Sequence, residues 1–184
     1  MITSRRGFLA ASGSLLGLAA CGNGVGSPGA PTIDARVDAT KAFLISHYPG
    51  VQDLMHKAAG VLYMPLMTEA GFGVGGAFGR GALRINGATV DYYTATKASI
   101  GFQIGAQQYS HVLFFMTPGA LADFRASNGW VASADMVYAV PTQGGSMGIS
   151  TTTEQTPVVA LVFGQAGLIA GASLAGVKYT RIIP

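Results

Sequence analysis

The chain contains little cysteine and little charge. Cys21 is the only cysteine among 184 residues, which excludes an intramolecular disulfide and a zinc site built from several cysteines. Asp, Glu, Lys and Arg make up 10% of the residues, against roughly 25% in typical domains. Apolar residues make up 49%. This balance predicts a surface that meets a membrane, an apolar ligand or another subunit.

The first twenty residues have the pattern of an export signal. Arg5 and Arg6 precede an uncharged stretch, residues 8–20, which is short for a membrane span and typical of a signal peptide. The sequence LAAC at residues 18–21 looks like a bacterial lipobox. We therefore expect residues 1–20 to be a removable twin-arginine signal peptide and Cys21 to be acylated in the exported protein. An ordinary signal peptide with an incidental cysteine is the alternative.

Removal of this segment changes the charge. Loss of Arg5 and Arg6 lowers the formal net charge from +3 to +1, so no excess of positive charge supports nucleic-acid binding. Acylation would also consume the Cys21 thiol, which excludes a cysteine nucleophile.

The remaining chain suits a single domain behind a short tether. Residues 21–32 are rich in Gly and Pro and predict a flexible linker with a reach of about 15–20 Å. The domain then covers residues 33–184. Gly22, in place of Asp after the lipidated cysteine, favours the outer membrane, where the domain would face the periplasm.

Apolar spacing predicts three helices. The first begins at the capping residue Thr32 and ends at Pro49-Gly50; the second runs to Gly60; the third begins at Thr117-Pro118 and ends at Asn128-Gly129. The expected buried positions of the first two are Ile33, Val37, Leu44 and Tyr48, then Val51, Leu54, Met55 and Ala58.

The rest of the chain favours β-structure. Apolar residues alternate over residues 100–105, and the near-continuous apolar runs 111–116 and 158–163 are typical of strands buried on both faces. Residues 71–81 have Gly or Ala at every odd position, which indicates a strongly coiled sheet or else a floor free of side chains on which an acyl chain or helix could lie. Residues 157–177 carry no charge, but Gly164 and Gly167 interrupt them, so we predict a β-hairpin over a membrane-spanning helix.

Motifs that resemble catalytic signatures lack the context that their chemistry needs. Residues 71–76 match G-x-G-x-x-G, but no helix is expected to open there. Ser146 lies in a G-x-S-x-G match at residues 144–148, but no histidine follows it. His47, His56 and His111 lack metal-ligand spacing, and the acids are scattered. We therefore predict no catalytic residue and no metal ligand.

Three segments, in the right order, resemble the SYLF domain family. They are residues 60–76, which contain GVLYMP and AGFGVGG; residues 101–117, which contain GFQIGAQ and LFFMT; and residues 163–176, FGQAGLIAGASLAG. The similarity covers roughly residues 35–184.

The resemblance implies binding of acidic phospholipid, with neither enzyme activity nor cofactor; some fungal members of the family bind actin. In eukaryotic members a basic amphipathic N-terminal helix contributes to membrane binding, whereas here Arg36, Lys41 and Lys57 lie beside three aspartates. The candidate head-group contacts are Arg36, Lys41, Lys57, Arg80, Arg84 and Lys97.

We therefore expect one α+β domain with a curved, largely antiparallel sheet, two N-terminal helices and one central helix. The expected function is non-catalytic phospholipid binding at the bacterial envelope. The alternative is a scaffolding protein that binds another envelope protein.

Overall fold

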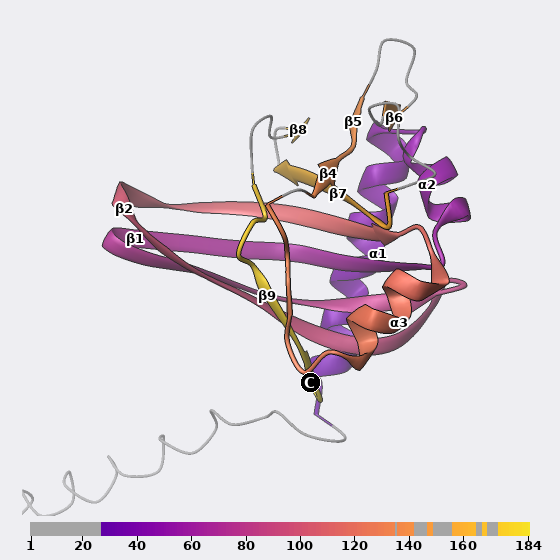
Figure 1. Ribbon diagram of the computed structural model, residues 1–184, viewed down its shortest axis with the longest axis horizontal. Helices are drawn as coiled ribbons and strands as arrows, with labels where there is room; N and C mark the ends of the chain where they lie inside the picture. The colour runs from indigo at the N-terminus through magenta and orange to yellow at the C-terminus, as the bar shows by residue number, and fades with distance from the viewer. Residues whose placement is uncertain (1–26, 135, 142–146, 149–155, 165–166, 169–172) are drawn as a thin grey trace, which may run out of the picture.

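The computed structural model of the chain shows an α+β domain (Figure 1). It describes residues 27–134, 136–141, 147–148, 156–164, 167–168 and 173–184. Two helices come first, then a very long β-hairpin, a third helix and several shorter strands. This order confirms the expected fold class, with two N-terminal helices and one central helix.

The first two helices pack on one face of the sheet. Helix α1 spans Gly29–His47 and buries Ile33, Val37 and Leu44, three of the four predicted positions; α2 spans Val51–Lys57. Tyr48 is only partly buried. The predicted start was wrong, because residues 29–32, assigned to the tether, are already helical. Thr32 lies inside the first turn, where its hydroxyl donates to the Pro28 carbonyl oxygen at 2.7 Å.

Helix α3 spans Pro118–Ala126 and begins as the sequence predicts. The Thr117 hydroxyl oxygen accepts a hydrogen bond from the Ala120 amide at 3.2 Å, which satisfies a free N–H of the first turn. The helix ends two residues before Asn128. Gly60, predicted as the end of α2, is the first residue of a strand, and α2 ends before Ala58.

Two strands of unusual length form the centre of the fold. Strand β1 spans Gly60–Ile85 and β2 spans Ala88–Phe115, and they pair antiparallel through a turn at Asn86-Gly87. Pro65 lies at a break in the register between Met64 and Met67, where a residue without an N–H is tolerated. A second break lies between Gly71 and Gly73.

The hairpin doubles back on itself, so that the two halves of β1 meet. A Cβ atom at Gly79 or Gly81 would collide with the carbonyl oxygen of Leu66 or Tyr63, respectively. The glycines at odd positions therefore permit a close backbone approach within a coiled sheet, and the alternative of an open floor for an acyl chain is not what Gly79 and Gly81 provide.

Shorter strands complete a seven-stranded sheet in the order β3-β9-β2-β7-β4, with β1 on β2 and β8 on β7. All pairs are antiparallel except β4 with β7. A separate pair joins β5 to β6. The bounds are Trp130–Val131 (β3), Val137–Tyr138 (β4), Val140–Pro141 (β5), Met147–Gly148 (β6), Val158–Gly164 (β7), Gly167–Leu168 (β8) and Lys178–Ile182 (β9).

Residues 158–164 and 167–168 thus form antiparallel strands, as predicted for this segment. Phe163 pairs with Leu168 and Gly164 with Gly167 across β7 and β8. Within the described part of the chain, no helix has the length and apolar character to cross a membrane.

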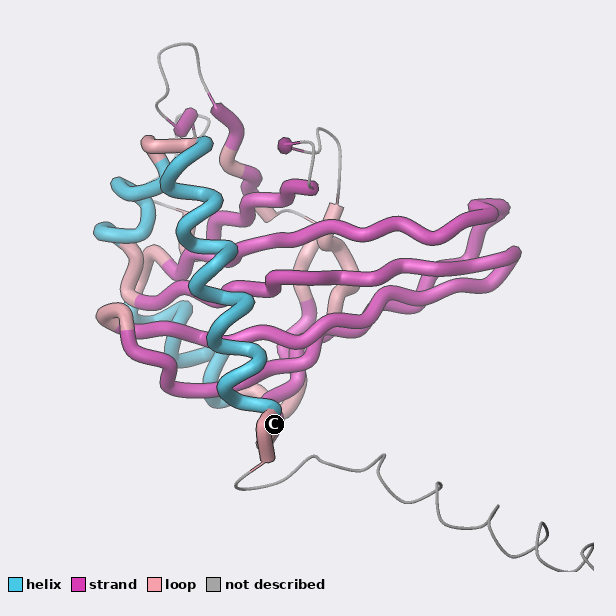
Figure 2. The backbone as a smooth tube through the Cα atoms, turned by 180° about the vertical axis from the view of Figure 1, so that it is seen from behind, coloured by secondary structure: helices cyan, strands magenta, loops and turns pink. Residues whose placement is uncertain are grey.

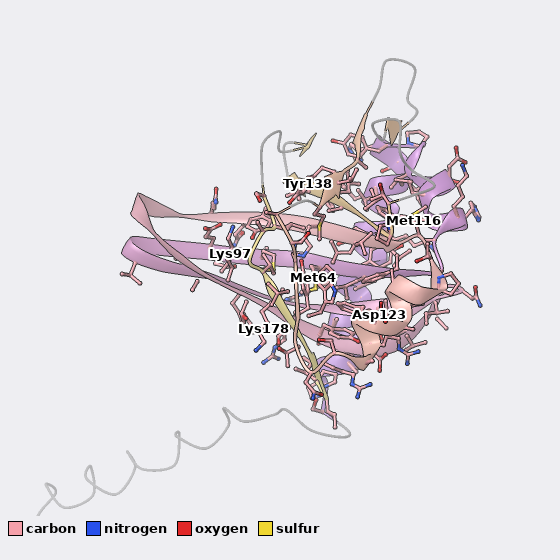
Figure 3. All side chains as sticks on the ribbon, in the orientation of Figure 1. Met64, Lys97, Met116, Asp123, Tyr138 and Lys178 are labelled. Atoms are coloured by element: carbon pink, nitrogen blue, oxygen red, sulfur yellow. The ribbon has the colours of Figure 1, made fainter. Side chains whose placement is uncertain are left out.

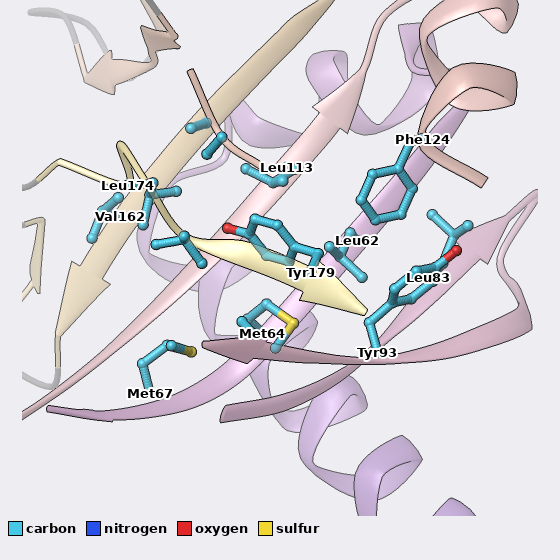
Figure 4. Packing of buried hydrophobic residues seen from close by; sticks show 14 of the residues in the cluster. Leu62, Met64, Met67, Leu83, Tyr93, Leu113, Phe124, Val162, Leu174 and Tyr179 are labelled. Atoms are coloured by element: carbon cyan, nitrogen blue, oxygen red, sulfur yellow. The ribbon is translucent and has the colours of Figure 1, made fainter. Parts of the chain in front are cut away.

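The sheet separates two hydrophobic cores. One lies inside the curl and includes Leu62, Leu113, Phe124 and Tyr179 (Figure 4); the other lies between the sheet and α1, seen from behind in Figure 2. The Phe124 ring centroid lies 4.6 Å from that of Phe115 and 4.7 Å from that of Tyr93. The described members of both cores lie within residues 33–179.

Candidate functional site

The six basic residues predicted to contact head groups do not form one cluster. Arg36 and Lys41 lie on α1 and Lys57 on α2, whereas Arg80, Arg84 and Lys97 lie on the hairpin. In the register, Lys97 is opposite Ala77, which lies seven residues from Arg84. At a rise of about 3.3 Å per residue, this separates Arg84 from the Lys97 level by about 23 Å.

Arg84 is held in an ion-pair network and is not available as a free cation. Its Nη1 lies 2.6 Å from Asp38 Oδ1, its Nη2 lies 3.9 Å from Asp34 Oδ1, and its Nε donates to the Thr89 hydroxyl at 3.3 Å. The Arg84 side chain is 11% exposed. The hydrogen bond and charge of Arg84 lower the pKa of Asp38. Arg84 therefore fastens α1 to the hairpin, which argues against the predicted head-group role.

Asp34 extends this network into the sheet. Its carboxylate accepts hydrogen bonds from the hydroxyls of Thr89 and Tyr92 at 2.8 and 2.7 Å. Burial, and then the bond to Asp34, raises the pKa of Tyr92 to about 12, so the phenol stays protonated and donating. The acids beside the basic residues of α1 thus have structural partners.

A groove of about 410 Å³ lies where α1, α2 and the start of β1 meet the Asn86-Gly87 turn. Lys41, His56 and Arg84 contribute its basic groups, and Met55 and Val61 are among its apolar lining residues. The volume is in the range of small-molecule sites. However, Arg84 is paired with Asp38, and Lys41 also lowers the pKa of that carboxyl by charge attraction. The groove therefore offers little net charge to a phosphate.

The bend near Gly71 and Gly73, where both strands fold back, has different chemistry from the groove. It lies far from the Asn86-Gly87 turn and is called the hairpin end below. Val74, Phe78 and Arg80 lie on the same side of β1, because they are separated by even numbers of residues. The side chains of Val74 and Phe78 are 73% and 50% exposed. The Arg80 guanidinium carbon lies 5.9 Å from the centroid of the Phe78 ring, within cation–π range. Lys97 lies on the other side of the sheet, where its Nζ donates to the Ser173 carbonyl oxygen at 3.1 Å (Figure 3).

This end of the hairpin contains one acid, Glu69. Residues 70–90 and 92–122 contain neither Asp nor Glu. Glu69, at the boundary, accepts a hydrogen bond from Gln107 at 3.0 Å. The predicted residues Arg80 and Lys97 thus lie three register positions apart, about 10 Å along the ribbon, on opposite faces. They lie beside exposed apolar residues that were not predicted as site residues. The uncharged run through residues 70–79 was the signal that could have found them.

The remaining motifs have structural explanations or fall outside the description. The G-x-G-x-x-G match lies entirely within β1, so no helix N-terminus holds a pyrophosphate there. His111 is fully buried, burial lowers its pKa to about 3, and its Nε2 lies 2.8 Å from the Tyr179 hydroxyl. Among the described residues no three His, Cys, Asp or Glu gather as a metal site. Ser146, Arg5, Arg6 and Cys21 lie outside the described residues.

The family comparison agrees with the resemblance seen in the sequence. Residues 96–181 match the model of a family described as Ysc84, Las17-binding protein actin regulator. This stretch begins within β2 and ends one residue before the end of β9. This is the SYLF domain family, and residues 96–181 belong to it. The curated proteins contain no match to the chain.

Proposed function

We propose that the protein binds membranes containing anionic phospholipid and catalyses no reaction. One observation carries this proposal: the projecting end of the hairpin exposes Val74 and Phe78 and holds Arg80 and Lys97 against a single acid, Glu69. Each Lys or Arg near an anionic surface contributes about 1 kcal/mol. With Glu69 counted against Arg80 and Lys97, the net charge of +1 gives about 1 kcal/mol, or roughly fivefold in affinity, before any apolar contact is counted.

Membership of residues 96–181 in the SYLF domain family supports this choice, because the family is associated with lipid binding. In this proposal an acyl group on Cys21 would hold the domain at the bacterial envelope, at the outer membrane facing the periplasm. The anchor would raise the local concentration of membrane surface, so a weak head-group interaction would suffice.

Vesicle flotation of residues 27–184 tests the proposal without the anchor. We expect the segment to float with vesicles of phosphatidylglycerol and phosphatidylcholine in equal parts, and to float less with phosphatidylcholine alone. Raising the salt concentration should reduce binding in part, since screening removes the charge contribution and leaves apolar contact. A segment that stays at the bottom of the gradient with every anionic lipid would refute phospholipid binding.

Binding to a protein is the second candidate. The family description names a Las17-binding actin regulator, and Val131 and Ile183 are exposed apolar side chains away from the hairpin end. Cross-linking in intact cells, followed by mass spectrometry, would favour this function if Val131→Asp removed a cross-linked partner while leaving vesicle flotation unchanged.

A further inference from the structure

The bend at which β1 and β2 fold back, near Gly71–Gly73 of β1 and Gly101–Gly105 of β2, projects beyond the other elements (Figures 1 and 2). The Asn86-Gly87 turn lies at the opposite end of the hairpin, beside the groove. On β2, strand β9 pairs with residues 92–96 and β7 with residues 110–115. In the described pairings, residues 97–109 of β2 therefore have only β1 as a neighbour. The projecting part is the β1–β2 ribbon folded back on itself, and it leaves the side chains of Val74 and Phe78 73% and 50% exposed.

This ribbon has no charge at its end. Residues 70–79 and 98–106 lack Asp, Glu, Lys and Arg and include Phe72, Val74, Phe78, Ile100, Phe102 and Ile104. Val74 and Phe78 are among the most exposed apolar side chains that the structure describes. Burial of one such side chain is worth about 1.5–3 kcal/mol, so a ribbon that leaves them in water gains by placing them in an apolar phase.

Cations lie just behind the uncharged part. Arg80 is two residues from Phe78 on the same face, and Lys97 is opposite Ala77 on the other face. Arginine and lysine have long apolar stems and keep their charge in the head-group layer while neighbouring residues enter the interface. Glu69 borders the same uncharged part on the other limb of β1, so the level behind it holds two cations and one acid. An uncharged end with a net positive level behind it matches the layers of an anionic leaflet.

The backbone limits how deep the ribbon can go. The β1–β2 ladder pairs residues inside the ribbon, such as Val74 with Ile100, but both outer edges of a two-stranded ribbon keep unpaired N–H and C=O groups. Such groups are costly in hydrocarbon and are solvated among head groups. The ribbon therefore suits the interface, about 5–10 Å deep, rather than a transmembrane position.

We propose that the hairpin end inserts into the interface of a bilayer rich in anionic phospholipid, with Val74 and Phe78 entering the acyl boundary and Arg80 and Lys97 contacting phosphates. This inference rests on the proposed function and assigns the membrane contact to the ribbon rather than to α1 or α2.

A polarity-sensitive fluorophore tests the insertion. Because Cys21 is the only cysteine, residues 27–184 contain no thiol, and Phe78→Cys creates a single attachment site for a nitrobenzoxadiazole label. With vesicles of phosphatidylglycerol and phosphatidylcholine in equal parts, we expect a blue shift and quenching by lipids brominated near the head-group end of the chain. Val131→Cys is the matched control, since Val131 is 52% exposed on β3 and should show neither response.

Charge placed in the ribbon gives the second test. The double variant Val74→Asp/Phe78→Asp should bind these vesicles at least about tenfold more weakly, whereas Val131→Asp should bind like the unmodified segment. Circular dichroism checks that the fold of each variant is retained.

The outcomes separate the two proposals. If the unmodified segment does not bind anionic vesicles, phospholipid binding fails and the inference fails with it. If it binds, but the label at position 78 is silent and the double variant binds equally well, membrane binding stands and the ribbon is the wrong surface. A label that shifts without vesicles, together with dimers in light scattering, would instead identify the ribbon as a contact between copies of the chain.

Discussion

As the pH falls, protonation of His111 should destabilise the fold before the carboxylates of the protein are protonated. The imidazole is fully buried, and burial lowers its pKa to about 3, against about 6.5 in an unfolded chain. Between these values the unfolded state binds one proton more, so stability is complete above about pH 6.5 and falls as the pH decreases. The slope is about 1.4 kcal/mol per pH unit, which gives a loss of about 2 kcal/mol between about pH 7.5 and about pH 5.

Urea denaturation followed by circular dichroism measures this loss. The pH range ends above the region where Asp38 titrates, because Arg84 lowers the pKa of that carboxyl. The variant His111→Gln should be less stable at neutral pH, since the bond to Tyr179 is disturbed, but its stability should no longer fall over this range. His56→Gln, at an exposed position, should retain the slope. Equal slopes in the unmodified protein and His111→Gln would refute the assignment.

Four further outcomes follow from packing and from the N-terminus. Gly81→Ala should destabilise the fold by about 1–3 kcal/mol or more, because the new Cβ meets the Tyr63 carbonyl. In α3, a Cβ atom at Gly119 would meet no atom, so Gly119→Ala should be neutral or stabilising by up to about 1 kcal/mol. Thermal melts of both glycine variants measure these effects. Phe124→Ala should cost about 3–5 kcal/mol in chemical denaturation, since its ring packs among Tyr93, Phe115 and Trp130. Cys21→Ala should abolish acylation, read by mass spectrometry and detergent partitioning; a variant that is still acylated would contradict the lipoprotein prediction.

The local elements were largely predictable, because their determinants lie close together in the chain. The buried stripe of α1 follows from the spacing of Ile33, Val37 and Leu44, and α3 follows from Thr117-Pro118. The errors were at helix ends. Gly29–Pro31 look like linker in composition, yet this end of the domain is fixed by a contact across the chain, in which the Ser27 hydroxyl donates to the Pro184 carbonyl oxygen at 2.7 Å. No pattern within a local window encodes such a contact.

The candidate site was predictable in composition but not in geometry. The sequence shows which residues are basic, but it does not show that Arg84 faces Asp38 from a strand 46 residues away. That pairing turns a predicted head-group contact into a link between α1 and the hairpin. Only the strand register brought Lys97 to within three positions of Arg80 along the ribbon.

By itself, the sequence determined the α+β class, the helical faces, the strand runs and the relation to the SYLF domain family, because periodicity and motifs are local properties. Only the tertiary structure decided that β1 and β2 are single long strands that double back at Gly71 and Gly73, and that their end projects with Val74 and Phe78 exposed. The physical reason is that exposure and charge pairing depend on what other segments cover. Two phenylalanines of the same hairpin, Phe78 and Phe114, thus end 50% exposed and fully buried, respectively.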